Sequence, residues 1–392
     1  MVHGRRWGCA LALLLLSPVS ATAADFKWHG LLDLMLAEHG PAFDYNKLTR
    51  GDNPFDPYRL RLFTDAQMED HVQVLGQFVY DDASGIYVDG AYIIYTPWLD
   101  RDLRFSAGKL PWIVGTWAPR TYSNKNPLVS APLMYQYHST LLWYAVPPSA
   151  DALHATAGTG QLGPDYFGFS FGPGMPVIDD SYWDVGINIS GSQRPFEYAI
   201  GLSAGTPSWG STHKDDNTGH SVLGRIGFAP SPALRLGASA SYGPYLHDSL
   251  DPDMPPGKTV NDYAQRLFMA DLEVQIAHVE LRAEAMRNTW MTPTVGDLDV
   301  EGGYAELKYS MSSGAYVAGR YDVERFGEIA NSSGVAHTWD WNVTRVEGAV
   351  GYRIARDATA KLVYQWTQQD NDNAGADDPE FSIVGAQISI GF

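Results

Sequence analysis

Charged side chains recur at every second position in the second half of the chain. Within residues 279–290, Glu280, Arg282 and Glu284 alternate with apolar residues. A two-residue period places neighbouring side chains on opposite faces of a β-strand, so this segment predicts one apolar and one charged face. Six successive segments share the pattern. Their charged positions are Asp271, Glu273, Glu280, Arg282, Glu284, Glu306, Lys308, Arg320, Asp322, Glu324, Arg345, Glu347 and Lys361.

A charged inner face is unusual because burying unpaired charge is costly. A water-filled lumen would remove that cost, and its charged wall would then tune ion selectivity. The alternative is that the charges pair across strands and plug or rigidify the structure. In the first half of the chain the charged inward positions are basic, namely Arg59, Arg61, Arg104, Arg225 and Arg235. The two halves could therefore form separate basic and acidic walls.

Residues with the chemistry of an active site do not form a convincing constellation. His247, Asp248 and Ser249 lie in a proline-rich loop without a strained nucleophile turn. His213 with Asp215 and Asp216 resembles the loop carboxylates of barrel proteases only superficially. The stretch 370–375 resembles half of a calcium loop, but the expected ligands are missing. We expect no catalytic residue, no metal site and no cofactor.

The elements that position the charges are sixteen predicted strands, mostly 10–12 residues long. Tight turns and long polar loops alternate strictly between them, and strands of this length cross a bilayer when tilted. We therefore predict an all-β, antiparallel transmembrane β-barrel spanning residues 25–392 as one domain. The predicted strands are 26–36, 57–66, 72–80, 86–97, 103–109, 182–191, 196–206, 221–229, 234–242, 263–277, 279–290, 303–311, 315–326, 342–353, 358–368 and 381–392. Strand 86–97 has ambiguous facing.

Residues 110–181 interrupt the pattern and are expected to form a long loop. Two apolar patches within it, 140–146 and 166–171, would raise the strand count to eighteen. Sixteen is preferred, because the rest of the segment lacks clean alternation. Its aromatic and basic residues could stack against a passing solute or anchor the loop to the wall. The candidates for a constriction are Trp112, Trp117, Arg120, Tyr122 and Lys125.

The first 24 residues have the features of a secretory signal peptide. Arg5 and Arg6 precede the apolar run 11–16, and small residues follow at 21–24. Removal of this segment leaves 25 basic against 45 acidic residues, a net charge of −20, and no cysteine, since Cys9 is the only one. This charge argues against a nucleic-acid partner.

The last twelve residues, FSIVGAQISIGF, alternate apolar and polar side chains and end on Phe392. This ending resembles that of bacterial outer-membrane β-barrel proteins, and the loop pattern resembles that of sixteen-stranded porins. The stretch GKLPWIVG, residues 108–115, is loosely similar to the phosphate-selective porin group, although that group's dense lysine clusters are missing. Aromatic residues near strand ends fit interfacial girdles. They are Trp28, Tyr58, Tyr80, Trp98, Trp183, Tyr242, Trp290, Tyr352 and Trp366.

The resemblance implies location in the outer membrane and a long loop folded into the lumen. It also implies contact with the lipid bilayer, with lipopolysaccharide and with the barrel-assembly machinery, and a possible homotrimer. The expected function is a water-filled channel for passive diffusion of small hydrophilic solutes or ions. Two alternatives stay open: a structural sheath for a periplasmic electron carrier, and a barrel hydrolase that would use His247 and Ser249.

Overall fold

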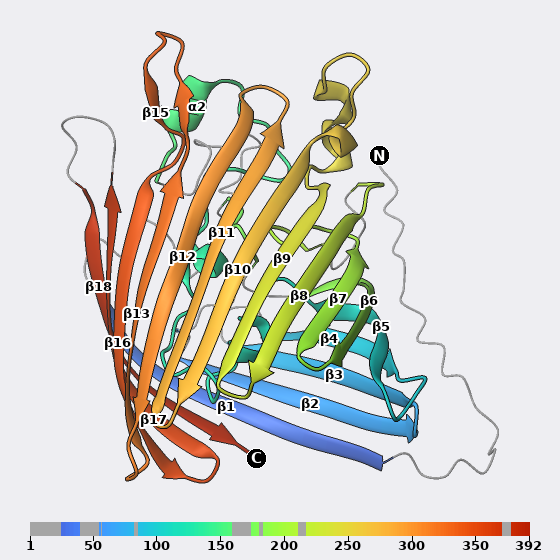
Figure 1. Cartoon of the computed structure of the whole chain (residues 1–392). Helices are drawn as coiled ribbons and strands as arrows, with labels where there is room; N and C mark the ends of the chain where they lie inside the picture. Colours follow the sequence, from blue (N-terminus) through green and yellow to red (C-terminus); the bar gives the residue numbers. More distant parts are fainter. Residues whose placement is uncertain are drawn as a thin grey trace, which may run out of the picture.

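The computed structural model describes residues 25–39, 55, 57–81, 85–158, 174–179, 183–210, 217–370 and 378–392. The expected signal peptide, residues 1–24, lies outside these ranges. Sixteen antiparallel strands close into a barrel in the order β1-β18-β17-β16-β13-β12-β11-β10-β9-β8-β7-β6-β5-β4-β3-β2 (Figure 1). The predicted sixteen-strand transmembrane barrel is confirmed.

Every predicted strand corresponds to one barrel strand, with bounds that differ by a few residues. The barrel strands are β1 (Asp25–His39), β2 (Tyr58–Glu69), β3 (Val72–Asp81), β4 (Gly85–Tyr95), β5 (Asp102–Pro111), β6 (Trp183–Gln193), β7 (Phe196–Ser203), β8 (Ser221–Ser231), β9 (Leu234–Pro244), β10 (Ala264–Ile276), β11 (Val279–Thr292), β12 (Gly296–Ser310), β13 (Ala315–Phe326), β16 (Asn342–Ala355), β17 (Ala358–Asp370) and β18 (Glu380–Gly391).

The two faces of the wall differ in polarity. On β17, Leu362 and Tyr364 are 59% and 53% exposed, whereas Lys361 and Gln365 are 4% and 1% exposed. Apolar side chains therefore point away from the barrel and polar ones point into it, the reverse of a soluble β protein. This arrangement satisfies the backbone in lipid because a closed barrel has no unpaired edge. Within the described ranges, we find no helix with the length and apolar character needed to span a membrane.

The seam of the barrel joins the two ends of the chain. β18 pairs with β1 from Leu31↔Gly391 to His39↔Ile383. Phe392 extends this pairing, because its amide donates to Gly30 O (3.0 Å) and Gly30 donates to Phe392 O (2.7 Å). A Cβ atom at Gly30 would lie 2.2 Å from the Phe392 ring. Glycine is therefore required for the ring to cover the seam.

The ambiguous facing of the fourth predicted strand has a structural cause. Gln77 pairs with Gly90, but the next residue, Phe78, pairs with Val88. Asp89 is the extra residue of a β-bulge, which shifts the alternation by one position. Val88 and Ile93 consequently both face outward, although their spacing is odd.

The long segment after β5 enters the barrel, and we call its described parts, residues 112–158 and 174–179, the excursion. It contains η1 (Ala118–Arg120), α1 (Leu133–Gln136) and α2 (Ala150–His154). The patch 140–146 forms no strand, and 166–171 lies outside the described residues. A small hairpin, β14 (Glu328–Ala330) and β15 (Ala336–Thr338), rises beside α2 at the long-loop end (Figure 1). The sequence analysis did not predict it.

Most of the predicted girdle residues face outward, but two do not. Trp183 and Trp290 are 6% and 0% exposed and belong to the apolar cluster inside the barrel. The prediction for these two residues was wrong because aromatic type alone does not specify the face. Inside the barrel, the excursion gives them an apolar environment.

Candidate functional site

All eighteen charged residues predicted to line a pore lie on the inward face of the wall. The structure does not distribute them as separate basic and acidic walls. Instead, acids and bases from neighbouring strands alternate and form ion pairs. Examples are Arg61 with Asp33 (3.3 Å) and Lys308 with Glu280 (2.9 Å). Arg225 also pairs with Asp271, whereas Arg104 pairs with Asp102 (2.8 Å) at the tight-turn end.

One continuous series of ion pairs runs along the wall from β7 to β16, and we call it the ion-pair chain. Its links are Glu197–Arg235 (2.9 Å), Arg235–Glu273 (3.6 Å), Glu273–Arg282 (3.8 Å), Arg282–Glu306 (3.6 Å), Glu306–Arg320 (3.6 Å), Arg320–Asp322 (3.1 Å) and Asp322–Arg345 (3.6 Å).

Exposure falls steeply along the ion-pair chain. The side chain of Arg235 is 45% exposed, that of Arg282 is 23% exposed, and that of Arg320 is fully buried. An exposed pair stabilises the fold little, but a buried charge that loses its partner is strongly destabilising. The ion-pair chain therefore begins at side chains that contact water. It ends in a part of the lumen where charges must be neutralised.

The exposed end of the ion-pair chain borders a cavity of about 760 Å³, which we call the vestibule. It lies against the tight turns that follow β6 and β8 and against the adjoining ends of β10 and β11. Its charged lining is balanced: Arg194, Arg235 and Arg282 face Glu197, Glu273 and Glu280.

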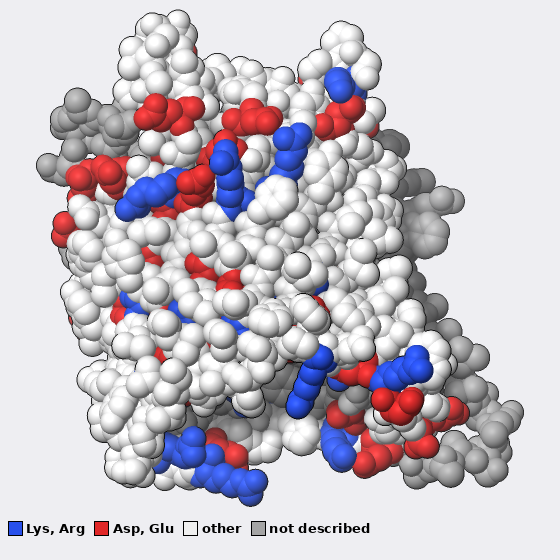
Figure 2. Space-filling view, in the orientation of Figure 1, with Lys and Arg blue, Asp and Glu red and all other residues white. Residues whose placement is uncertain are grey.

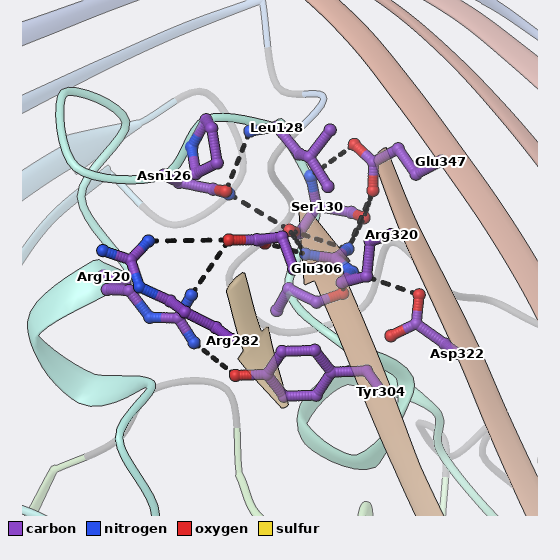
Figure 3. Close-up of polar contacts among 12 residues, drawn as sticks. Arg120, Asn126, Leu128, Ser130, Arg282, Tyr304, Glu306, Arg320, Asp322 and Glu347 are labelled. Carbon is purple, nitrogen blue, oxygen red and sulfur yellow. Dashed lines mark hydrogen bonds and ion pairs between the residues drawn. The ribbon is translucent and has the colours of Figure 1, made fainter. Parts of the chain in front are cut away.

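The excursion binds to the buried end of the ion-pair chain (Figure 3). Glu347 accepts hydrogen bonds from the amides of Val129 (3.0 Å) and Ser130 (3.1 Å) and from the Ser130 hydroxyl. Arg320 donates to Glu347 (2.8 Å) and to the Ser130 carbonyl (3.1 Å). The loop backbone thus completes the hydrogen bonding of a buried ion pair.

Two further wall carboxylates bind the first part of the excursion. Glu284 accepts the amide of Thr116 (2.7 Å) and the hydroxyls of Thr116 and Tyr135. Glu306 accepts from Arg120 (3.1 Å), which also donates to the hydroxyl of Tyr304. These contacts place Arg120 in the lumen, as the sequence suggested, but as a partner of the wall.

Lys361 anchors the turn of the excursion nearest the tight-turn end. Its ammonium donates to the carbonyls of Ser123 (2.6 Å), Asn126 (2.8 Å) and Leu128 (3.0 Å) and to Gln387 Oε1 (3.0 Å). Three backbone acceptors on one cation fix the loop conformation, since charge-assisted hydrogen bonds are the strong ones.

The aromatic residues of the excursion are anchors in this structure. Trp117 is 1% exposed, and the guanidinium carbons of Arg120 and Arg320 lie 4.7 and 5.7 Å from its ring centroid. Trp112 is 6% exposed. The Tyr122 hydroxyl donates to Gln77 on the opposite wall (2.7 Å). Lys125 lines two smaller cavities at the tight-turn end, of about 390 and 260 Å³.

In this half of the barrel the structure agrees with the second alternative, in which the inward charges pair across strands, and not with a water-filled lumen. Here the excursion covers the charges and ion pairing neutralises them. Toward the long-loop end, inward apolar residues such as Trp290, Leu298 and Val343 pack with the excursion into a buried cluster. The sequence pattern revealed the alternation but could not reveal what covers the inward face.

Sequence reasoning missed one buried acid that also binds the excursion. Asp340 lies between β15 and β16 and accepts the amides of Gly158 (2.7 Å) and Thr140 (2.8 Å). Its neighbours, Trp339 and Trp341, are 0% and 8% exposed. An aspartate between two tryptophans was the available signal for burial.

The possible hydrolase residues form a local turn. His247 Nδ1 accepts the amide of Ser249 (3.0 Å) and lies 2.8 Å from its hydroxyl, at the start of the short helix η2 (Asp248–Asp253). The imidazole therefore caps the helix. His213, Asp215 and Asp216 lie outside the described residues. No cluster of metal-binding side chains occurs in the part of the chain that the structure describes.

We predict that Glu347→Ala releases the excursion. The substitution removes one of the counter-charges of the buried Arg320, a change that costs about 3–5 kcal/mol. The measurements are the thermal unfolding midpoint and the rate of proteolytic cleavage within residues 112–158. Arg235→Gln is the matched control, since its exposed pairs are worth less than about 1 kcal/mol. Equal effects of the two substitutions would refute the anchoring role.

We also predict a pH dependence that originates at Asp340, which lies outside the membrane-spanning strands. Burial raises the pKa of its carboxyl to about 6, despite the amides that donate to it. The contribution of Asp340 to the free energy of unfolding is therefore fully present below the pKa of an exposed aspartate, where the carboxyl is protonated in both states. It is lost as pH rises through about 6, a change on the order of 3 kcal/mol.

Hydrogen exchange of the Thr140 and Gly158 amides, corrected for intrinsic rates, should show greater protection at pH 5 than at pH 7. Asp340→Asn should abolish the difference. Glu324 on β13 and Tyr137 in the excursion act electrostatically with Asp340, and Glu324→Gln separates the glutamate's contribution. Greater protection of the wild type at pH 7 would contradict the assignment.

Comparison with known proteins supports the fold. No family model and no curated relative matches the sequence. Among solved structures, the chain is similar to the outer membrane channel DcaP of Acinetobacter baumannii, with TM-score 0.56, 11% identity, and coverage of 94% of this chain and 98% of that chain. It is similar to Salmonella typhi OmpF in complex with daunomycin, with TM-score 0.55, 11% identity, and coverage of 94% and 97%.

A third similar structure is the trimer form of OmpT, an outer membrane protein of Vibrio cholerae, with TM-score 0.53 and 12% identity. The alignment covers 94% of this chain and all of that chain. These similarities agree with the closed barrel and its apolar outer wall. The predicted outer-membrane location is confirmed. The chain has the porin-like fold of an outer-membrane β-barrel.

Proposed function

We propose that the protein is a porin, without enzymatic activity, that passes small hydrophilic solutes or ions passively across the outer membrane. The observation that carries the proposal is the asymmetric attachment of the excursion. Most of the charged side chains that bind it, including Glu284, Glu306, Glu347 and Lys361, lie on β11 to β17. The other side contributes Asp33 of β1 and Gln77 of β3, which accept from Ser123 and Tyr122. A loop whose charged anchors lie mainly on one side narrows a lumen without sealing the whole cross-section.

We place the constriction where the excursion begins. Trp112 and Ile113 line a small cavity together with Asp184 and Asn188 of β6. The volume of this cavity is only about 10 Å³. The inward residues Gln73 and Asn188, on β3 and β6, are half-buried, unlike the fully buried Arg320 of the opposite wall. A polar path along this side would join the vestibule to the long-loop end.

The two alternatives receive less support. A sheath needs interior space for a folded electron carrier, but the excursion occupies the interior of the barrel. A hydrolase needs an available base, but His247 caps a helix. A homotrimer is proposed because one similar structure is described as a trimer form. The signal peptide and recognition by the barrel-assembly machinery are proposed from the terminal sequences alone. Phosphate selectivity has no support in the comparisons, and we do not propose it.

We predict stepwise, ohmic openings when the purified protein is inserted into planar bilayers. Trp112→Ala should increase the single-channel conductance, because it removes the largest side chain at the proposed constriction. Trp98→Ala is the matched control, since Trp98 is 48% exposed on the turn after β4 and lies away from the constriction. Absence of openings from well-folded protein would rule out the porin.

Selectivity should be weak, in contrast to the cation preference that a dominant acidic wall would give. Deep acids such as Glu306 and Glu347 are ion-paired, and the vestibule has three basic and three acidic side chains. Arg235→Gln should shift the reversal potential in a salt gradient in the direction of cation selectivity. Glu273→Gln should shift it in the direction of anion selectivity. Shifts of the same sign, or none, would show that the vestibule does not set selectivity.

A further inference from the structure

One of the cavities at the tight-turn end of the lumen, with a volume of about 260 Å³, is lined by basic side chains, and we call it the basic pocket. It lies between the wall strands β12 to β17 and the turn of the excursion at residues 123–127. Its basic residues are Lys125, Lys308, Arg353 and Lys361, and none of the described residues that line it is acidic. Figure 2 shows Lys and Arg side chains gathered at this end of the molecule, at the lower left, below a broad uncharged band.

The charge of the basic pocket contrasts with that of the rest of the protein. The chain has 45 acidic and 27 basic residues, and the vestibule has equal numbers of both signs. Like charges around one small cavity repel one another unless counter-charges lie near. Glu280 neutralises one of them, since it binds Lys308 (2.9 Å). The remaining positive charge attracts an anion into the pocket.

The four basic residues differ in their capacity to bind a ligand. Lys361 already donates to three carbonyls of the excursion and to Gln387. Lys308 binds Glu280 and lies 5.4 Å from the centroid of the Tyr316 ring. Lys125 and Arg353, by contrast, are exposed and form no ion pair with any residue that the structure describes. These two side chains are therefore available to contact an anion, and the other two add to its attraction.

The two available cations belong to different parts of the structure. Lys125 is part of the excursion, whereas Arg353 lies near the end of β16, where its amide donates to Gly314 O (3.0 Å). Between them, the Tyr316 hydroxyl donates to the carbonyl of Pro127 (3.0 Å) and already connects the wall to the turn. An anion that contacts both Lys125 and Arg353 would add a second connection at the same place.

The chemistry and size of the pocket favour a small oxyanion. Ammonium and guanidinium groups donate charge-assisted hydrogen bonds to carboxylate, sulfate and phosphate oxygens. The hydroxyls of Ser310, Ser312 and Thr359, which also line the pocket, can donate further bonds. Two cations without partners match an anion with two negative charges. Sites for drug-sized ligands have volumes of about 300–1,000 Å³, so this cavity suits a smaller molecule.

We propose that the basic pocket binds a small, doubly charged oxyanion, either a tetrahedral inorganic anion or a dicarboxylate, between Lys125 and Arg353. The bound anion links the turn of the excursion to the wall and stabilises its position. The pocket lies on the β12 to β17 side of the lumen, whereas the polar path that we propose for solutes runs along β3 and β6. The site therefore does not require the protein to be a channel.

The test measures the affinity of the folded protein in detergent for sulfate and for succinate by isothermal titration calorimetry, with chloride used to keep the ionic strength constant. Lys125→Gln and Arg353→Gln should each weaken binding by roughly tenfold, because each removes one charge-assisted contact. Arg356→Gln is the matched control and should bind like the wild type. Arg356 is an exposed arginine in the turn that follows β16 and does not line the pocket. Tighter binding of sulfate would assign a tetrahedral anion to the site, and tighter binding of succinate would assign a dicarboxylate.

Hydrogen exchange gives a second readout of the same site. The bound anion should slow exchange of the Lys125 and Asn126 amides, which both donate to Tyr122 O (2.8 and 2.9 Å). Arg353→Gln should abolish this protection, although it changes the wall and not the excursion.

Three results would overturn the proposal. The first is that neither anion binds more tightly than chloride. The second is equal weakening in all three variants, because the affinity would then reflect a general attraction to positive charge. The third is binding that leaves the exchange of the turn unchanged.

Discussion

The interior of this barrel depends on the cost of removing charge from water. Arg320 is fully buried and contacts Glu347, Asp322 and the carbonyl of Ser130. None of these partners would be dispensable, since a buried charge without a partner costs several kcal/mol. The excursion can cover the charged wall only because it supplies backbone amides and carbonyls to the groups that it removes from water. Wall and loop therefore stabilise each other.

The same constraint divides the lumen along its length. Near the tight turns, Arg235 and Glu273 remain partly hydrated and border the vestibule. Deeper in the barrel, charges are paired or bind the excursion, and beyond them Trp290 and Trp339 belong to an apolar cluster. In the porin that we propose, solute passage depends on the hydrated charges, whereas stability depends on the buried ones. A substitution at one end should thus alter transport properties, and one at the other end should alter the order of the loop.

The cost of removing charge from water also determines the outer wall, where lipid instead of the excursion covers the side chains. Apolar side chains such as Leu362 and Ile226 face the bilayer, and charged ones occur where headgroups, water and ions can compensate them. Arg287 and Glu301 on the outside and Arg320 and Glu347 on the inside are both cross-strand pairs of opposite charge. They differ in exposure: the inner pair is covered by the excursion, whereas the outer pair is accessible.

The sequence by itself determined the strands and the identity of the inward face, and it favoured sixteen strands over eighteen. Alternation has a fixed period of two, so Arg320 and Glu347 had to share a face that Val317 and Val346 do not. It also determined the seam, because the last strand could close the barrel only against the first. Where a bulge changed the phase, at Asp89, the period became ambiguous.

Only the tertiary structure decided what the inward charges do. Residues 112–158 have no regular period, so neither their path nor the contact of Ser130 with Glu347 could be read from spacing. The two residues are separated by more than two hundred positions, and closure of the barrel brings them together. For the same reason Asp340 and Trp290 were not recognised as interior residues: Gly158 and Ser208, which bind them, belong to distant parts of the chain.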